Sequence, residues 1–417
     1  MAINLHPRNL RIEDYDYPLP DDRIALFPLE QRDSSKLLLV RNGRTGEDIF
    51  SNMATHLPPD SLVVFNETRV IHARLLFRRP TGSRIELFCL EPVAPYRDHL
   101  RAFGCTGQAD WLCLVGNSKR WKHGGLELTA GEGKDQFVLK AETTSRNEDG
   151  SSVIRFTWHP EHLTFSHILE QAGKIPLPPY IHRDPVHNDE RTYQTIYASR
   201  EGSVAAPTAG LHFSPEVLAS LEAKGIKSQR LVLHVGAGTF RPVSSERLEG
   251  HEMHAEQVDL PLLALKDLRG NLDRKITAVG TTTTRLLESL YWHGVKVIMG
   301  LSEPSVLDVR QWDPYDLPVP GKISREESLD TVISGCERMG AGSVRGATSL
   351  IIAPGYRFRY PDILITNFHQ PRSTLLLLIS SFIGKNWKEA YRYALENNFR
   401  FLSYGDSCLF YKSEPGR

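Results

Sequence analysis

The sequence lacks most of the features that would place it outside ordinary globular proteins. Its five cysteines are odd in number and form no C-x-x-C pair, which argues against a zinc knuckle and against a disulfide framework. Lys plus Arg equals Asp plus Glu at 50 each, so no global field draws the chain onto nucleic acid or anionic lipid. A polyanionic partner must therefore be met by a local patch.

Long hydrophobic runs are also missing. The most apolar stretch, residues 375–383, is about half of the roughly 20 residues that a membrane span requires, and it is typical of a buried helix. The N-terminal segment mixes charges and prolines where a secretory signal would need an apolar core. We therefore expect a cytoplasmic protein, a monomer, with no membrane among its partners.

The order of strand and helix signals predicts the architecture. Residues 61–158 carry one strand-like run after another, broken by turn chemistry such as Pro80-Thr81-Gly82-Ser83, and after about residue 160 helices and strands alternate. The fold class that we predict is α/β: a layered α/β main domain (1–68 and 160–417) with an inserted antiparallel β-barrel domain (69–159). Segment 302–346, with several prolines and a capping box at Ser324, is expected to be a surface insertion carrying a short helix.

Individual elements follow from caps and apolar periodicity. In the α/β part we expect helices at 163–172, 214–225, 284–293, 373–383 and 386–398, and strands at 230–235, 275–280, 350–355, 362–367 and 400–410.

Two glycine-containing segments could hold a ligand. In SVAAPTAGLHF (203–213), small residues around Thr208 and Gly210 allow close approach of the backbone, and His212 could place an imidazole beside it. In LHVGAGTFRPV (233–243), a Gly-x-Gly follows a strand, but a third glycine is missing and Pro242 interrupts the helix, which excludes a dinucleotide site and the glycine-rich loop of ordinary methyltransferases. Backbone N–H groups of Gly236, Gly238 and Thr239 remain able to bind a polar group.

The segment HEMHAE (251–256) suggests a metal site, an acid/base group or plain structure. Its histidines are three residues apart, so the H-E-x-x-H spacing of zinc proteases is absent. On a strand, Glu252, His254 and Glu256 would share one face and His251 would lie on the other.

Three further segments end strands in polar residues, at the place where α/β folds collect their sites. AVGTTTTRLLES runs from a strand into a helix, and its Thr281, Thr282 and Arg285 could bind a carboxylate or phosphate. DILITNFHQPRST supplies Asn367 and His369, and LSYGDSCLF supplies Asp406.

Taken together, these motifs resemble the S-adenosylmethionine:tRNA ribosyltransferase-isomerase family of queuosine synthesis. The patterns APTAGLHF, LHVGxGTFxPV, HxMHxE, AVGTTxxR, DxLxTNFHxPxST and FxSYGDxxxF all occur in the family's order, as do YDYPLPDDRIALFP, RDSSKLLLV, LVVFNETRVIHARL, LPPYIHR and YQTIYAS. The departures are His72, Gln370 and two longer segments, 93–109 and 302–346. None of them touches a candidate acid or base.

The resemblance implies an enzyme that transfers and isomerises the ribosyl part of S-adenosylmethionine onto 7-aminomethyl-7-deazaguanine at the tRNA wobble position, giving epoxyqueuosine, adenine and methionine. It implies S-adenosylmethionine as co-substrate, no metal, and a tRNA partner. Such chemistry needs a base, an acid for adenine and shielding of the sulfonium cation from water. The candidate catalytic residues are His212, His234, His254, Glu256, His369 and Asp406, and those for S-adenosylmethionine are Thr208, Gly210, Gly236, Gly238, Thr239, Thr281, Thr282, Arg285 and Asn367.

A basic stretch in the inserted domain is the expected contact surface for tRNA. Between Asn66 and Gly125 there are ten Lys or Arg against five Asp or Glu, and Lys119 and Lys122 lie in the loop SKRWKHGG, with Trp111 and Trp121 nearby for stacking. Two other classes stay open: a metal-dependent hydrolase would explain the His/Glu cluster, and a non-catalytic RNA-binding module would explain the basic loop.

Overall fold

The computed structural model describes residues 6–95, 99–147, 150–236, 243, 245–319 and 321–413. The main body is built on a seven-stranded mixed sheet, and the four strands at one end of it are parallel. In spatial order the strands are β13 (Lys227–Leu231), β3 (Leu62–Asn66), β16 (Ile276–Val279), β19 (Ile363–Asn367), β20 (Ser407–Tyr411), β1 (Lys36–Arg41) and β2 (Arg44–Ile49). Their parallel direction brings the carboxyl ends of β16 and β19 to one edge.

Helices cover both faces of this sheet, as alternating apolar side chains on central strands require. One face packs Val63 and Ile365 against α4 (Pro215–Ala223) and a short 3-10 helix, Phe50–His56. The other face packs against α6 (Thr281–Ile298), α9 (Thr374–Ile383) and α10 (Asn386–Glu396). The main body is therefore layered, and this part of the predicted fold class is confirmed.

A four-stranded sheet extends the main body on the α6 side. Its order is β14 (Leu233–His234), β15 (Glu256–Pro261), β18 (Ser343–Thr348) and β17 (Val306–Val309), with α5 (Leu262–Arg269) and α8 (Arg325–Met339) packed beside it. Leu329 and Val332 of α8 belong to the same buried cluster as Leu290 of α6. Segment 302–346 is therefore part of the core of the main body, and our expectation of a surface insertion is corrected.

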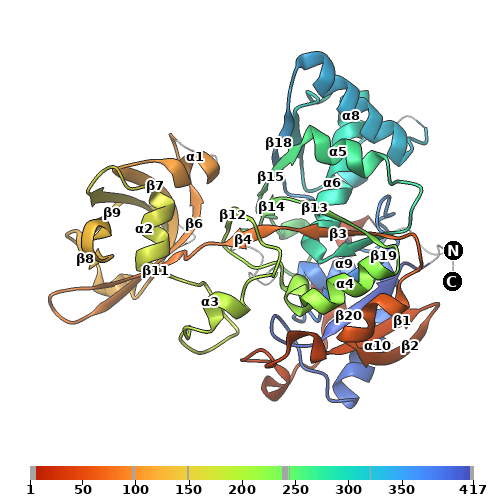
Figure 1. Cartoon of the computed structure of the whole chain (residues 1–417), viewed down its shortest axis with the longest axis horizontal. Helices are drawn as coiled ribbons and strands as arrows, with labels where there is room; N and C mark the ends of the chain where they lie inside the picture. Colours follow the sequence, from red (N-terminus) through yellow and green to blue (C-terminus); the bar gives the residue numbers. More distant parts are fainter. Residues whose placement is uncertain are drawn as a thin grey trace.

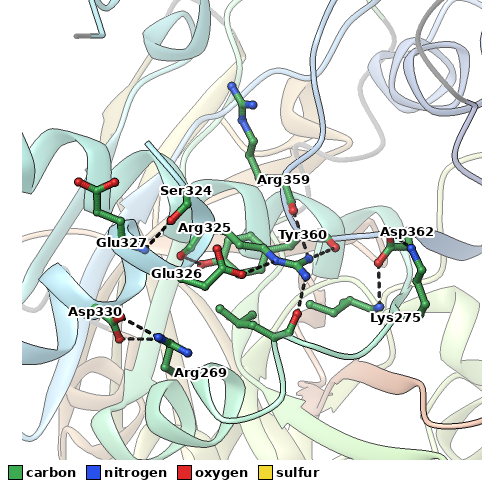
Figure 2. Close-up of polar contacts among 12 residues, drawn as sticks. Arg269, Lys275, Ser324, Arg325, Glu326, Glu327, Asp330, Arg359, Tyr360 and Asp362 are labelled. Atoms are coloured by element: carbon green, nitrogen blue, oxygen red, sulfur yellow. Dashed lines mark hydrogen bonds and ion pairs between the residues drawn. The ribbon is translucent and has the colours of Figure 1, made fainter. Parts of the chain in front are cut away.

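The start of α8 shows how this segment is held. Ser324 caps the helix as expected, because its Oγ accepts from the backbone N–H of Glu327 at 3.0 Å. Figure 2 shows the guanidinium of Arg325 between Glu326 and the backbone carbonyls of Arg359 and Tyr360, and it also donates to the carbonyl of Leu272. One side chain thus joins α8 to two loops of the main body.

The β-rich part forms a separate seven-stranded sheet in which every pairing is antiparallel, seen at the left of Figure 1. Its order is β11 (Gly173–Lys174), β5 (Arg74–Arg78), β6 (Arg84–Pro92), β7 (Gln108–Gly116), β10 (Ser151–His159), β9 (Phe137–Arg146) and β8 (Leu126–Ala130). The sheet curls until β5 and β8 meet, around a core that includes Trp111 and Phe165 of α2 (Phe165–Ala172). The inserted antiparallel sheet of the predicted fold class is confirmed.

Two short parallel strands, β4 (Thr68–Val70) and β12 (Arg200–Ser203), lie between the two parts (Figure 1). The remaining helices are short: α1 (His99–Gly104), α3 (Asp189–Thr192) and α7 (Asp313–Asp316). Within the described residues, no helix is both long and apolar enough to cross a membrane.

Three predicted strands differ from the structure, and the one expected at 400–410 is confined to β20 (Ser407–Tyr411). The run 230–235 is divided, because the chain leaves β13 in the large sheet and enters β14 in the four-stranded sheet. The run 350–355 forms no strand, since its backbone bonds elsewhere: Ile351 N–H donates to the carbonyl of Gln311, and Ala353 N–H donates to the hydroxyl of Tyr315.

Candidate active site

A pocket lies at the edge where β16 and β19 end. It is formed by the start of α6, the end of β19, the short 3-10 helix Thr208–His212 and the turn before β20. Its lining includes Thr208, Thr281, Thr282, Arg285, Asn367 and His369 from the sequence candidates, together with Tyr180, Thr366 and Ser403. Residues from four distant segments thus meet at the strand ends, as the topology of α/β sheets favours.

The four threonines of α6 divide into two pairs. Thr283 Oγ1 donates to the carbonyl of Val279 at 2.6 Å and Thr284 Oγ1 to that of Gly280 at 3.2 Å, so these hydroxyls are used within the helix. Thr281 and Thr282 line the pocket instead. Gly280 precedes them with φ of +92°, a backbone angle that a side chain would strain.

His212 and Asn367 form a buried hydrogen-bonded pair. Asn367 Nδ2 donates to His212 Nε2 at 3.0 Å and to the carbonyl of Leu402 at 3.2 Å, which fixes the orientation of the amide. His212 Nε2 is therefore the acceptor, and its Nδ1 carries the proton and donates to Ser35 Oγ at 2.8 Å. Burial, and then Arg32 and Arg400, lower the pKa of His212 to about 3, so its imidazole is neutral at pH 7.

The amide of Asn367 leaves one atom for a ligand. Asn367 Oδ1 is buried and has no hydrogen-bond partner among the residues that the structure describes. A buried acceptor without a partner costs about 1–3 kcal/mol, and a donor from a bound substrate would remove that cost.

His369 is also buried and neutral. Its Nε2 bonds Thr366 Oγ1 at 2.9 Å, and its backbone N–H donates to Tyr391 OH at 3.1 Å. Tyr17 OH donates to its carbonyl at 2.5 Å. Burial lowers the pKa of His369 to about 3. These contacts fix the turn that follows β19 and hold the imidazole in the wall of the pocket.

Glu256 joins His254 to Arg285. Its Oε1 lies 3.5 Å from His254 Nε2 and its Oε2 lies 3.0 Å from Arg285 Nη1, while Arg285 Nε donates to the carbonyl of Leu350 at 3.1 Å. Arg285 Nη2 is buried and has no hydrogen-bond partner in the described parts of the chain. His254 is the most exposed of the three, with 29% of its side chain accessible, and its ring lies 3.9 Å from the Cβ position of Gly236.

His234 lies deeper, between the two parts of the molecule. Its Nδ1 is 3.3 Å from Thr68 Oγ1, and the neighbouring residue Val235 lines the pocket. A Cβ atom at Gly202 would lie 2.3 Å from His234 Nδ1, so the glycine makes room for the imidazole. The backbone of Gly202 thereby fixes the ring in place.

Two candidates have other roles. Asp406 accepts from the backbone N–H groups of Lys36 at 2.9 Å and Arg400 at 2.7 Å, so its carboxylate fixes backbone rather than orienting a histidine. A Cβ atom at Gly210 would lie 2.1 Å from Tyr197 OH, so the absence of a side chain at this position makes room for the tyrosine. Gly238 and Thr239 lie outside the described residues.

Sequence reasoning assigned no role to Tyr180, Thr366 and Ser403, which line the pocket, or to Ser35, which bonds His212 from outside it. Tyr180 OH and Ser403 Oγ are 2.5 Å apart in the pocket wall. Ser35 and Tyr180 lie in the motifs RDSSKLLLV and LPPYIHR, which was the available signal for them.

A second cavity, which we name the outer cleft, lies on the other side of His212. It is lined by residues from segments 28–35, 191–198, 211–216 and 403–405, and it shares Ser403 with the pocket. In the parts of the chain described, no group of three or more His, Cys, Asp or Glu side chains is placed to hold a metal ion. The side chain of Glu256, from the segment HEMHAE, is engaged by the guanidinium of Arg285.

Comparison with known proteins agrees with these motifs. The family described as queuosine biosynthesis protein matches residues 12–410. The chain is 37% identical over 404 residues to the S-adenosylmethionine:tRNA ribosyltransferase-isomerase of Trichlorobacter lovleyi, covering 95% of this chain and 99% of the relative. It is 36% identical over 406 residues to the enzyme of the same name from Thermotoga maritima, covering 96% and 99%. A crystal structure of S-adenosylmethionine tRNA ribosyltransferase from Thermotoga maritima aligns with a TM-score of 0.44 at 28% identity, covering 95% of this chain and 99% of that chain.

Proposed function

We propose roles for the residues of this pocket from the premise that the chain belongs to the queuosine biosynthesis protein family and is an S-adenosylmethionine:tRNA ribosyltransferase-isomerase. The reaction transfers and isomerises the ribosyl moiety of S-adenosylmethionine onto 7-aminomethyl-7-deazaguanine at the tRNA wobble position, and it releases adenine and methionine. S-adenosylmethionine is thus a co-substrate and tRNA is the acceptor.

The pocket at the ends of β16 and β19 is the proposed binding site of S-adenosylmethionine. The observation that carries this proposal is the meeting of two buried polar atoms without described partners, Asn367 Oδ1 and Arg285 Nη2, in the lining of one pocket. The guanidinium suits the methionine carboxylate, because planar N–H donors match carboxylate oxygens. Asn367 Oδ1 suits a hydroxyl or amino donor of the same substrate.

The start of α6 supports the same placement. Thr281 and Thr282 present hydroxyls and the first N–H groups of an 18-residue helix to the pocket, where the helix dipole favours negative charge. Thr208 lines the same pocket. The carboxylate end of the co-substrate therefore belongs near α6.

His254 is the proposed general base. Its neighbour Glu256 can stabilise the imidazolium that forms when a proton is removed from the carbon beside the sulfonium, and Arg285 fixes Glu256 in turn. His212 and His369 are held neutral by burial and hydrogen bonds, so we assign them to positioning the pocket wall. His234 is assigned to fixing the strand that leads to Gly236.

The acceptor and the surroundings of the enzyme follow from the reaction. A tRNA-modifying enzyme works where tRNA is present, so we propose a cytoplasmic location. We also propose that the enzyme is a monomer, because all the proposed roles fall to residues of a single chain.

The test is incubation of the protein with S-adenosylmethionine and tRNA that bears the 7-aminomethyl precursor, followed by nucleoside mass analysis. We expect epoxyqueuosine in the tRNA, with free adenine and methionine in equal amounts. Turnover should survive EDTA, since the proposed roles fall to side chains alone. Formation of S-adenosylhomocysteine would indicate methyl transfer and overturn the proposal, and loss of turnover restored by one added metal would favour the hydrolase alternative.

A further inference from the structure

The outer cleft carries an unusual surface at its mouth. Three of the exposed large apolar side chains lie in or directly beside the segments that line the cleft: Leu26, Phe27 and Ile196, with 40%, 52% and 41% of their surface accessible. Phe27 directly precedes Pro28 and Leu29 of the cleft lining. Within the described chain, it is the one aromatic residue among the exposed large apolar side chains. Exposed apolar surface gathered in this way marks an interaction site.

Phe27 is held in place despite its exposure. The guanidinium of Arg183 lies 4.1 Å from the centre of the Phe27 ring, and Arg183 Nε donates to the carbonyl of Leu26 at 2.9 Å. Arg400 donates to the carbonyl of Phe27 itself. The ring therefore has a fixed backbone and a cation on one face, which prepares it to contact a partner at little entropic cost.

Arg183 is itself fixed by a buried acid. Its Nη1 and Nη2 bond the two carboxylate oxygens of Asp189 at 2.7 Å and 2.8 Å, and Asp189 Oδ1 also accepts from Tyr404 OH at 2.7 Å. Only 1% of the Asp189 side chain is accessible. The aromatic ring and its cation are thus anchored to the interior through α3, which lies between the inserted sheet and the main body (Figure 1).

The cleft behind Phe27 is rich in arginine. Arg32, Arg69 and Arg191 line it, and the exposed carboxylates in the lining are those of Glu30 and Glu216. Arg32 and Arg191 both line this cleft, and the charge of Arg191 adds to burial in lowering the pKa of Arg32. A phosphate oxyanion between them would offset their repulsion.

We propose that the outer cleft and Phe27 bind the unpaired nucleotides of the tRNA anticodon loop, with one base stacked on Phe27 and backbone phosphates on the cleft arginines. Single-stranded RNA is recognised by aromatic and guanidinium planes beside cationic grooves, which is the combination found here. The inference rests on the proposed function, because it is the reaction that supplies tRNA as partner. The cleft adjoins the pocket at Ser403, so a loop held there would have its wobble base beside the co-substrate.

The experiment uses the full chain and an anticodon stem-loop RNA with 2-aminopurine at an unpaired position next to the wobble nucleotide. Stacking on an aromatic ring is worth about 1–3 kcal/mol per base, so we expect Phe27→Ala to weaken RNA binding about 5-fold or more. The fluorescence quenching that wild type causes on binding should be lost as well. Phe27→Trp should keep both properties, and Phe27→Leu, which is apolar but has no ring, should resemble Phe27→Ala.

A matched control is Leu263→Ala on α5, where a side chain that is 80% accessible is removed away from the cleft. RNA binding by this variant should equal that of wild type. A further variant, Arg191→Gln, should reduce the slope of log affinity against log salt by about one.

Three results would overturn the proposal. Equal RNA affinity for wild type and Phe27→Ala would exclude stacking of a base on Phe27. Equal RNA affinity and quenching for Phe27→Leu and Phe27→Trp would indicate an apolar protein-docking surface instead. Loss of melting temperature and S-adenosylmethionine affinity together with RNA affinity would make Phe27 structural. Each is distinguishable from failure of the proposed function, because wild type would still release adenine in the presence of precursor tRNA.

Discussion

The amide of Asn367 donates from Nδ2 to Nε2 of His212 across 3.0 Å, and this bond joins the end of β19 to the short helix Thr208–His212. Because Nδ2 is used in this way, Oδ1 is the amide atom without a partner among the described residues, and we propose that it accepts from the co-substrate. The histidine therefore acts as an acceptor that orients the asparagine.

Removing one or the other hydrogen-bond partner of His212 should have different effects. Asn367→Ala deletes the ligand acceptor, so we expect about tenfold weaker S-adenosylmethionine binding by calorimetry, the size of one hydrogen bond. Ser35→Ala deletes the acceptor of His212 Nδ1 without touching the pocket, so it should lower the free energy of unfolding by about 1–3 kcal/mol and leave co-substrate affinity near wild type. Unchanged affinity in Asn367→Ala would exclude the assigned role.

Much of this site follows from the sequence, and the missing parts have a physical reason. Polar residues at strand ends were expected to line the site, and Thr281, Thr282 and Asn367 do line the pocket. The expectation held because the strands of AVGTTTT and DILITN are parallel and end at one edge. The sequence could not show the packing role of Gly210, since only the fold shows that Tyr197 fills the space where its side chain would lie.

The aromatic residues illustrate the same limit. Trp111 and Trp121 were expected to stack on tRNA, but they are only 0% and 2% accessible, so both belong to the interior of the inserted part. Whether a tryptophan beside a basic loop faces solvent depends on which strands pair around it. Local spacing cannot show this, and the exposed Phe27 lay in a segment with no periodic signal.

The buried histidines should make stability depend on pH. Burial lowers the pKa of His293 to about 4 from an ordinary 6.5, as it lowers those of His212 and His369 to about 3. A depressed folded-state pKa gives stability that is complete above about pH 6.5 and lost as pH falls toward the folded value. Each such histidine contributes about 1.4 kcal/mol per pH unit in that window.

This dependence can be measured at His293, which lies outside the pocket and whose Nε2 bonds the carbonyl of Pro304 at 2.9 Å. Between pH 7.5 and pH 5, the free energy of unfolding of His293→Gln should fall by about 2 kcal/mol less than that of wild type. Urea denaturation at the two pH values measures the difference. The control His182→Gln changes an exposed imidazole and should follow wild type. Identical pH slopes for wild type and His293→Gln would contradict the buried, neutral state.

Kinetic measurements should distinguish the roles of His254 and His369. If His254 is the base, His254→Asn should lower turnover about 100-fold or more with co-substrate affinity near wild type, because an amide can bond but cannot carry the proton. His369→Gln should keep turnover within about tenfold, since its neutral ring only holds the turn after β19. Single-turnover assays with precursor tRNA measure both, and the reverse order would exchange the two roles.

The basic loop of the inserted sheet offers an independent test of tRNA binding. Lys119 and Lys122 are exposed, and the double change to Ala should weaken tRNA binding and lower its log-log salt slope by about one unit per phosphate contact. S-adenosylmethionine affinity should not change. The double control Lys322→Ala/Lys385→Ala removes two exposed lysines from the main body, and a slope equal to that control would assign Lys119 and Lys122 to solvated surface.

The central claim is that S-adenosylmethionine binds in the pocket between the start of α6 and the end of β19. A crystal structure of the protein with S-adenosylmethionine tests it most directly. We predict density for the co-substrate beside Thr282, with its carboxylate on Arg285 Nη2 and a donor on Asn367 Oδ1. Density for S-adenosylmethionine in the outer cleft, with the pocket unoccupied, would contradict the claim.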